Sequence, residues 1–194
     1  MNWTYIFNPL AKIPSKAFLL IGIITAVAGS FISYFNKTIY DGILDAHSFP
    51  LITYTQAITA NIIDIVLPCI LLFILGRIIN PKTRMIDILN TSFLYRIPIY
   101  IFPLLNNIPA MQSIEAKIND PSVGIRNIQF SPDETFNLIW ISCLALGIIA
   151  YAICLMVFGF KTATNAKKTW HYGAFAAIFI FSEIITKYIV YTIL

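Results

Sequence analysis

Apolar residues gather in five long runs along the chain, and polar residues cluster between them. The runs cover approximately residues 17–35, 57–79, 88–106, 136–160 and 172–194. An α-helix needs about 20 mostly apolar residues to cross the hydrocarbon core of a bilayer, and each run is close to that length. The pattern predicts an all-α membrane protein, a bundle of five transmembrane helices. Trp3, Tyr5 and two lysines precede the first run and predict a short N-terminal interfacial segment.

The composition agrees with a lipid environment. The chain is 58% hydrophobic and 11% charged, with a mean hydropathy of +0.78, whereas an ordinary soluble domain is about 25% charged. The lipid bilayer is therefore the expected partner. A net charge of +4 without a basic aromatic patch argues against nucleic acid. No repeat or linker divides the chain, so we expect a single domain over residues 1–194.

The sequence "SPDE" marks a helix start before the fourth run. Ser131 suits the N-cap, Pro132 the first helical position and Glu134 the third. This pattern predicts a capping box, in which the serine and glutamate side chains satisfy backbone N–H groups that lack helical partners.

The positive charges predict the orientation, because cytoplasmic loops carry an excess of Lys and Arg. With a cytoplasmic N-terminus, the outside segments hold Lys37, Lys117 and Arg126. The inside segments then hold the larger group: Lys12, Lys16, Arg77, Lys82, Arg84, Lys161, Lys167 and Lys168. We therefore expect the N-terminus in the cytoplasm and the C-terminus outside.

Four ionisable side chains fall within the predicted spans: Asp64, Arg96, Glu183 and Lys187. A charge at the bilayer centre costs about 3 kcal/mol on insertion scales, so unpaired charges there are unfavourable. Their expected depths are compatible with one neutral network that joins spans two, three and five. Such a network either fixes the register of the helices or lines a polar cavity for an ion, a proton or a lipid head group.

Three prolines lie in the same spans. Pro68, Pro98 and Pro103 would each kink a helix and free the carbonyl four residues earlier. A carbonyl freed in lipid needs a partner from protein or trapped water. Ordinary kinking explains the prolines, and the broken helices of transporter sites are the functional alternative.

Small residues recur at one-turn spacing in the first span, at Gly22, Ala26 and Ser30, and open the last span at Gly173 and Ala177. Such spacing lets helices approach closely. It predicts packing within the bundle or, alternatively, contact with other membrane proteins or a homo-oligomer.

The loop after the first span carries Asp41, Asp45 and His47. Two carboxylates and an imidazole are suitable ligands for a divalent cation, and a solvated or hydrogen-bonded loop is the simpler interpretation. The chain lacks the common hydrolase, zinc-protease and phosphate-loop motifs. His47 and His171 are expected on opposite sides of the membrane, so we expect neither an enzyme nor a cofactor.

Two segments carry a family resemblance. The stretch from Phe7 to Ser30, which opens Phe-Asn-Pro, and the stretch from Phe73 to Leu105 resemble prokaryotic Yip1-domain proteins. The resemblance implies a compact membrane domain of five helices without catalysis. Eukaryotic members bind small GTPases through a long cytosolic N-terminal region and a Gly-Pro motif. This chain shows neither, so we do not expect small GTPase binding.

These observations leave two functional hypotheses. The first is a non-enzymatic membrane protein that scaffolds or organises membrane partners, most simply in a bacterial cytoplasmic membrane. The second is a small transporter or channel component that uses the polar network. A water-lined path to Arg96 or Asp64 would favour transport, and a closed network would favour scaffolding.

Overall fold

The computed structural model describes residues 3–118 and 129–193. Its elements are α1 (Trp3–Phe7), the 3-10 turn η1 (Pro9–Ala11), α2 (Ser15–Phe35), β1 (Thr38–Ile39), β2 (His47–Ser48), α3 (Tyr54–Ile79), α4 (Met85–Ile99), α5 (Phe102–Asn106), α6 (Pro109–Ile118), α7 (Pro132–Thr164) and α8 (Thr169–Ile193). Arg126, assigned above to the outer side, lies outside the described residues.

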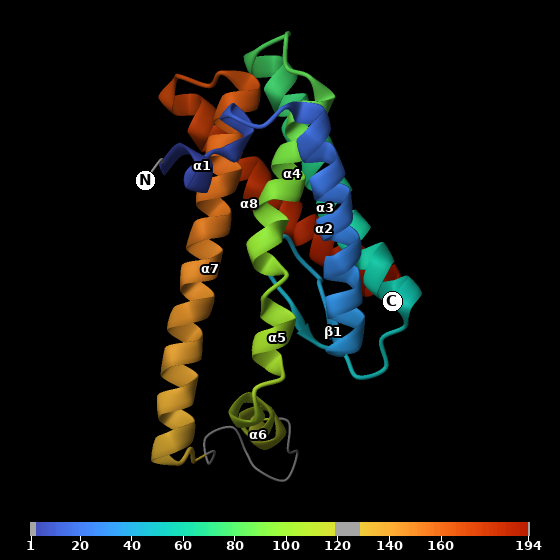
Figure 1. Ribbon diagram of the computed structural model, residues 1–194, viewed down its shortest axis with the longest axis vertical. Helices are drawn as coiled ribbons and strands as arrows, with labels where there is room; N and C mark the ends of the chain where they lie inside the picture. The colour runs from blue at the N-terminus through green and yellow to red at the C-terminus, as the bar shows by residue number, and fades with distance from the viewer. Residues whose placement is uncertain (1–2, 119–128, 194) are drawn as a thin grey trace.

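Among the described residues, five helical segments are long and apolar enough to cross a membrane. They are Ser15–Phe35, Tyr54–Ile79, Met85–Asn106, Pro132–Thr164 and Thr169–Ile193. The predicted all-α fold with five spans is confirmed, although each span begins two to four residues earlier than the sequence pattern indicated. Figure 1 shows α2, α4 and α7 along the long axis, with α8 crossing obliquely behind them.

The third span lies at the centre of the bundle. In this span 72% of the apolar window is buried, against 22% to 39% in the other four. Its buried face includes Asn90, Thr91, Ser92 and Arg96. A helix surrounded by protein can carry polar groups that would be costly against lipid. This explains why the least apolar span occupies the middle.

The prolines act in different ways. Pro68 lies inside α3 and Pro98 inside α4. The hydroxyl of Tyr95 donates a 2.6 Å hydrogen bond to the Asp64 carbonyl, four residues before Pro68. The freed carbonyl thus has the protein partner that the sequence argument requires. Pro103 lies instead in the first turn of α5, after a break in the span, where proline is tolerated.

Two of the long helices, α3 and α7, begin with a side-chain cap. The predicted capping box of α7 is present, with Ser131 accepting from the Glu134 N–H and Glu134 accepting from the Ser131 N–H. A second box at α3 pairs Thr53 with Gln56 and was not predicted. Both boxes satisfy N–H groups where the chain enters a membrane-length helix.

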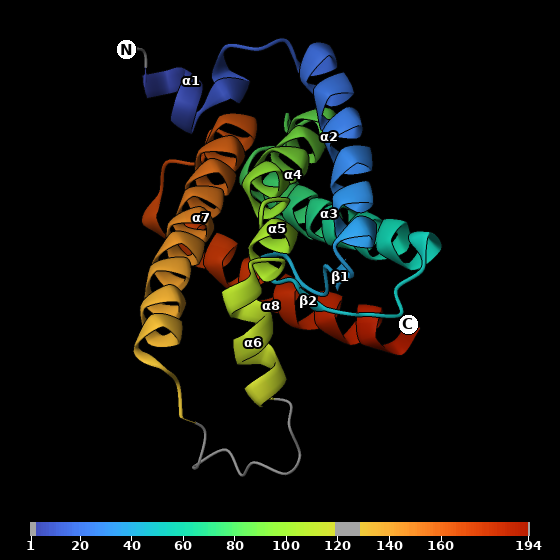
Figure 2. The ribbon, with the colours of Figure 1, turned by 60° about the horizontal axis from the view of Figure 1, so that its bottom comes forward.

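The loop between α2 and α3 turns inward. Strands β1 and β2 pair antiparallel, and Tyr40 and Ile43 beside them are fully buried. Ile43 packs in one core cluster with Leu72, Tyr95 and Phe160. Figure 2 shows this loop between α2 and α8. Irregular backbone at such a place is tolerated because protein covers it.

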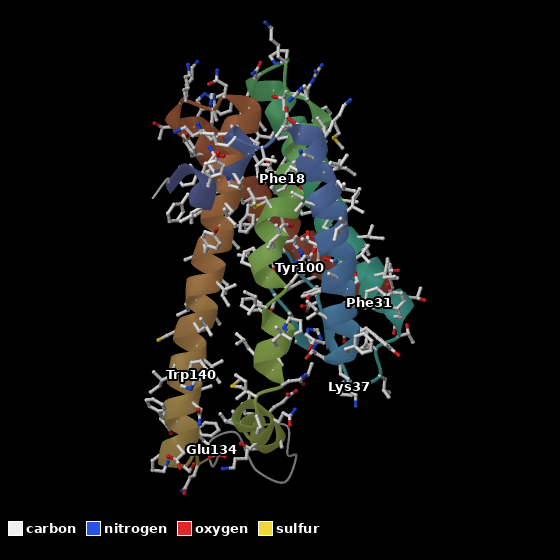
Figure 3. The ribbon with its side chains drawn as sticks, in the orientation of Figure 1. Phe18, Phe31, Lys37, Tyr100, Glu134 and Trp140 are labelled. Carbon is white, nitrogen blue, oxygen red and sulfur yellow. The ribbon has the colours of Figure 1, made fainter. Side chains whose placement is uncertain are left out.

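The turns of the bundle separate into two ends. Figure 1 shows α1, the α3–α4 turn and the α7–α8 turn together at the top, and we call this the basic end. It carries most of the predicted inside charges: Arg77, Lys82, Arg84, Lys161, Lys167 and Lys168. Figure 3 shows Phe18 towards this end and Lys37, Glu134 and Trp140 towards the other. Which end faces the cytoplasm stays a prediction.

The small residues of α2 face the bundle. A Cβ atom at Gly22 would lie 2.5 Å from the Phe93 ring, and one at Gly29 would overlap the Tyr100 ring. The Ala26 carbonyl accepts a hydrogen bond from Asn61. In contrast, Gly147 and Gly173 have nothing near a Cβ atom among the described residues. The α2 stripe therefore serves close packing of helices within one chain.

We expect Gly22→Ala and Gly29→Ala to lower stability by about 1–3 kcal/mol each, because the added methyl group overlaps an aromatic ring from α4 or from the break after it. The measurement is thermal unfolding of the purified protein in detergent. Gly147→Ala and Gly173→Ala are matched controls, because they add the same methyl group in open space. Equal losses in all four variants would contradict close packing as the cause.

Candidate functional site

The centre of the bundle holds an ion pair between α3 and α4. Arg96 Nη2 lies 3.0 Å from Asp64 Oδ2, and both side chains are 0% exposed. Removing two charges from water is costly, and the pair persists only if further contacts compensate. Figure 3 places Tyr100, which lies against the Arg96 guanidinium, near the middle of the long axis.

Arg96 receives those contacts from several elements. Its Nη1 donates to the carbonyls of Gly42 and Ile43 at 3.0 and 3.1 Å, and its Nη2 donates to Asn61 Oδ1 at 3.2 Å. Its guanidinium carbon also lies 4.7 Å from the Tyr40 ring centre and 5.7 Å from that of Tyr100. A planar fork with several donors can make all these contacts, whereas a lysine ammonium cannot.

Asn61 extends the network to α2. It lies one turn before Asp64 on α3, and its Nδ2 donates to the Ala26 carbonyl and to Ser30 Oγ at 2.9 and 3.0 Å. Its Oδ1 also accepts from the Tyr100 hydroxyl at 3.2 Å. One amide therefore connects the second span to the first and to the central span.

The second pair of charges, Glu183 and Lys187 on α8, also contacts the loop between α2 and α3. Glu183 on α8 accepts from the backbone N–H of Ile43 at 2.6 Å and of Leu44 at 3.3 Å. Lys187 lies one turn later and binds Asp45 at 2.6 Å, with Glu183 3.9 Å away. The loop thus gives its carbonyls to Arg96 and its N–H groups to Glu183.

Gly42 allows this close approach. A Cβ atom at this position would overlap the carboxylate of Glu183. Glycine is suited to positions where another group must come close to the backbone. The absence of a side chain therefore lets α8 contact the loop at the point where Arg96 contacts it from α4.

We call this assembly the central polar network: Asn61, Asp64, Arg96, Glu183, Lys187 and loop residues 42–45. The four charges predicted from the sequence belong to it, on spans two, three and five. Their connection differs from the direct contact expected, because backbone of the loop separates the Asp64–Arg96 pair from the Glu183–Lys187 pair.

Sequence reasoning missed the loop and the neutral partners. The apolar residues Ile39, Tyr40 and Ile43 in a short connection were a signal of burial. The spacing of Asn61 and Asp64 was a second signal, because residues three apart share a helix face. Nothing in the sequence pattern separates the buried hydroxyl of Tyr95 from an interfacial tyrosine.

Some atoms of the network have no hydrogen bond. Asp64 Oδ1 and Arg96 Nε are buried without a partner. Each such atom raises the cost of the buried pair, so the stability of the network rests on the remaining contacts. These atoms are also where a small molecule or proton would first act if it reached the pair.

The loop acids and His47 do not converge on one point. Asp41 Oδ2 lies 3.1 Å from His47 Nδ1, while Asp45 binds Lys187. Within residues 3–118 and 129–193, no three Asp, Glu, His or Cys side chains are grouped to hold a metal ion. Asp41, Asp45 and His47 thus have ion-pair partners, which agrees with the hydrogen-bonded loop that was the simpler interpretation.

Comparisons with known proteins do not extend these findings, since no family model, curated protein or solved structure matches the chain. The resemblance to Yip1-domain proteins therefore stays a prediction that rests on the residues quoted above.

We expect Arg96→Leu to destabilise the protein by about 3–5 kcal/mol, because Asp64 would stay buried without its cation. The double variant Asp64→Leu/Arg96→Leu should recover only part of this loss, since the Gly42 and Ile43 carbonyls still lack their donor. Reversible unfolding in micelles measures both. Full recovery in the double variant would show that the loop contacts contribute nothing.

The His47 pair predicts a dependence on pH. The hydrogen bond to Asp41 raises the pKa of His47 above its usual value. A raised pKa in the folded state means that the pair stabilises the fold at low pH and that this contribution disappears as pH rises through the folded pKa. We expect NMR titration to show the raised pKa and Asp41→Asn to lower it. An unchanged pKa in that variant would exclude Asp41 as the cause.

Proposed function

We propose that this multi-pass membrane protein is a non-enzymatic scaffold, similar to Yip1-domain proteins, that organises other components of a bacterial cytoplasmic membrane. The part supported directly is the membrane-spanning bundle, by the length and composition of its five helices. The proposed orientation places the N-terminus and the basic end in the cytoplasm, following the distribution of Lys and Arg.

The observation that carries the proposal is the complete burial of the Asp64–Arg96 pair at the centre of the central polar network. Asp64 and Arg96 are both 0% exposed, and the guanidinium already contacts a carboxylate, an amide oxygen and two carbonyls. A substrate site needs a path and unoccupied binding groups. Closed contacts that connect four helical spans through one loop favour a structural role for the charges.

A transport component remains the second candidate because of two observations. The third span breaks between α4 and α5, close to the buried pair, and Asp64 Oδ1 and Arg96 Nε lack hydrogen-bond partners. Broken helices beside intramembrane charges occur at transporter sites. This candidate requires a second conformation in which water reaches the pair.

The two candidate functions predict different numbers of protein adducts from a photo-crosslinking residue that replaces Lys82. Lys82 is exposed in the turn between α3 and α4, at the basic end. A scaffold should give reproducible protein adducts in cells from Lys82 and few from a probe at Lys37, which is also exposed and lies towards the other end. Mass spectrometry identifies the adducts.

The flux of protons and monovalent ions into proteoliposomes tests the transport candidate. Vesicles that contain the protein should pass protons and monovalent ions no faster than empty vesicles, because the Asp64–Arg96 pair is fully buried. Asp64→Asn should leave this background unchanged. Flux above background that disappears in Asp64→Asn would overturn the scaffold proposal in favour of transport.

A further inference from the structure

A small polar cavity lies at the basic end, away from the central polar network. Its volume is about 150 Å³, and it is enclosed by the start of α2, the start of α4, the end of α7 and the N-terminal turn η1. The polar part of its wall comes from Ser15, Arg84, Asp87, Asn90 and Thr162, and the apolar part includes Leu10. Figure 2 shows the N-terminal segment passing over this end of the bundle.

The polar wall is a connected set of side chains. Arg84 donates to the two oxygens of Asp87 through Nε at 2.7 Å and Nη2 at 2.8 Å, and Ser15 Oγ donates to Asp87 at 2.9 Å. Asn90 donates to the Ser15 carbonyl at 2.8 Å. These contacts fix the position of the carboxylate and of the amide relative to α2.

Two acceptors in this wall can take further donors. Asn90 is 1% exposed, and its Oδ1 is buried without a hydrogen-bond partner. A carboxylate offers about four acceptor sites, so Asp87 can accept beyond its present contacts. The cavity is therefore suited to a small group that carries several N–H or O–H donors, and the charge of Asp87 favours a cation.

The rim of the cavity has the opposite charge preference. The Arg84 side chain is 65% exposed, and its guanidinium has five N–H donors, of which Asp87 takes two. Lys12, Lys16 and Lys161 are exposed and neighbour lining residues in the chain. An anionic group just outside the cavity would meet these cations at the membrane surface.

An apolar cavity continues the same surface into the membrane. Its volume is about 520 Å³, and its wall includes Leu94, Ile97 and Leu155. Leu94 lies one turn after Asn90 on α4, and Leu155 one turn before Gly159 on α7, which lines the polar cavity. Along these two helices the cationic rim at Arg84 lies outermost, the cation-accepting cavity lies about one turn deeper, and the apolar cavity follows one turn deeper again.

We infer that this surface binds a phospholipid whose head group ends in a primary ammonium, that is, the ethanolamine class. The phosphate contacts Arg84 and the rim lysines, the ammonium turns inward from there and donates to Asp87 and to Asn90 Oδ1, and an acyl chain follows the apolar cavity between α4 and α7. A choline head group has no N–H donor, and a glycerol head group has no charge for Asp87. The site is independent of whether the protein scaffolds or transports.

Native mass spectrometry of the full chain in detergent tests the inference. The probes are phosphatidylethanolamine, its mono- and dimethyl derivatives, phosphatidylcholine and phosphatidylglycerol, all with the same acyl chains. Binding should fall along the methylation series, to about tenfold weaker for choline, since losing a hydrogen bond to a charged group changes an equilibrium by about that factor. Equal retention of the choline and ethanolamine lipids, or stronger retention of phosphatidylglycerol, would overturn the assignment.

Soluble probes distinguish a lipid from a free phosphate compound. O-phosphoethanolamine and inorganic phosphate share the charges of the head group but have no acyl chain. We expect both to compete with the lipid only at concentrations about 100-fold above it, because they leave the apolar cavity empty. Competition at the lipid's own concentration would overturn the inference and indicate a soluble ligand.

Variants locate the site. Arg84→Gln should weaken ethanolamine lipid binding about tenfold, while Lys82→Gln, in the same turn but not lining the cavity, should change it less than twofold. Ala163→Leu fills the cavity without removing a polar group and should also weaken binding. Asp87→Asn should remove the preference for ethanolamine over glycerol. Unchanged binding in Arg84→Gln and Ala163→Leu, with unfolding temperatures equal to wild type, would exclude this cavity.

Discussion

The contact of the Arg96 guanidinium with the Gly42 and Ile43 carbonyls determines much of the architecture. Those carbonyls belong to a loop that has no helical hydrogen bonds of its own, so inside a bundle they need a donor. Arg96 supplies it from α4, and Glu183 supplies the matching acceptor for the loop N–H groups from α8. A non-helical segment can therefore lie buried between α4 and α8, because each helix supplies a hydrogen-bonding group that the loop needs.

The position of α4 follows from the same requirement. A cation is costly against lipid, and the helix that carries it is surrounded by the others. Glycines on α2 let the rings of Phe93, on α4, and Tyr100, directly after it, pack closely against α2. Tyr95 in turn satisfies the carbonyl that Pro68 frees on α3. Space on α2 and a hydrogen bond to α3 thus accommodate α4, whose polar residues Asn90, Thr91, Ser92 and Arg96 are buried in protein.

The two polar regions of the protein have opposite properties. The Asp64–Arg96 pair in the central polar network is fully enclosed, so its atoms without a partner, Asp64 Oδ1 and Arg96 Nε, do not face solvent. The cavity at the basic end has a buried acceptor without a partner and a cationic rim in contact with solvent. Closure is what a structural network requires, whereas a binding site must leave some groups available. This difference supports a structural role at the centre and lipid recognition at the surface.

The sequence by itself determined the membrane class, the five spans, the capping box at Ser131 and the residues that had to find partners: Asp64, Arg96, Glu183 and Lys187. Each of these follows from local physics, namely hydrophobic length, N-cap chemistry and the cost of charge in lipid. Only the tertiary structure decided how the charges are joined. The partners of Arg96 include backbone atoms of a distant loop, and any residue type supplies such atoms. The sequence does not indicate which carbonyl the Arg96 guanidinium contacts, because that depends on the path of the whole chain.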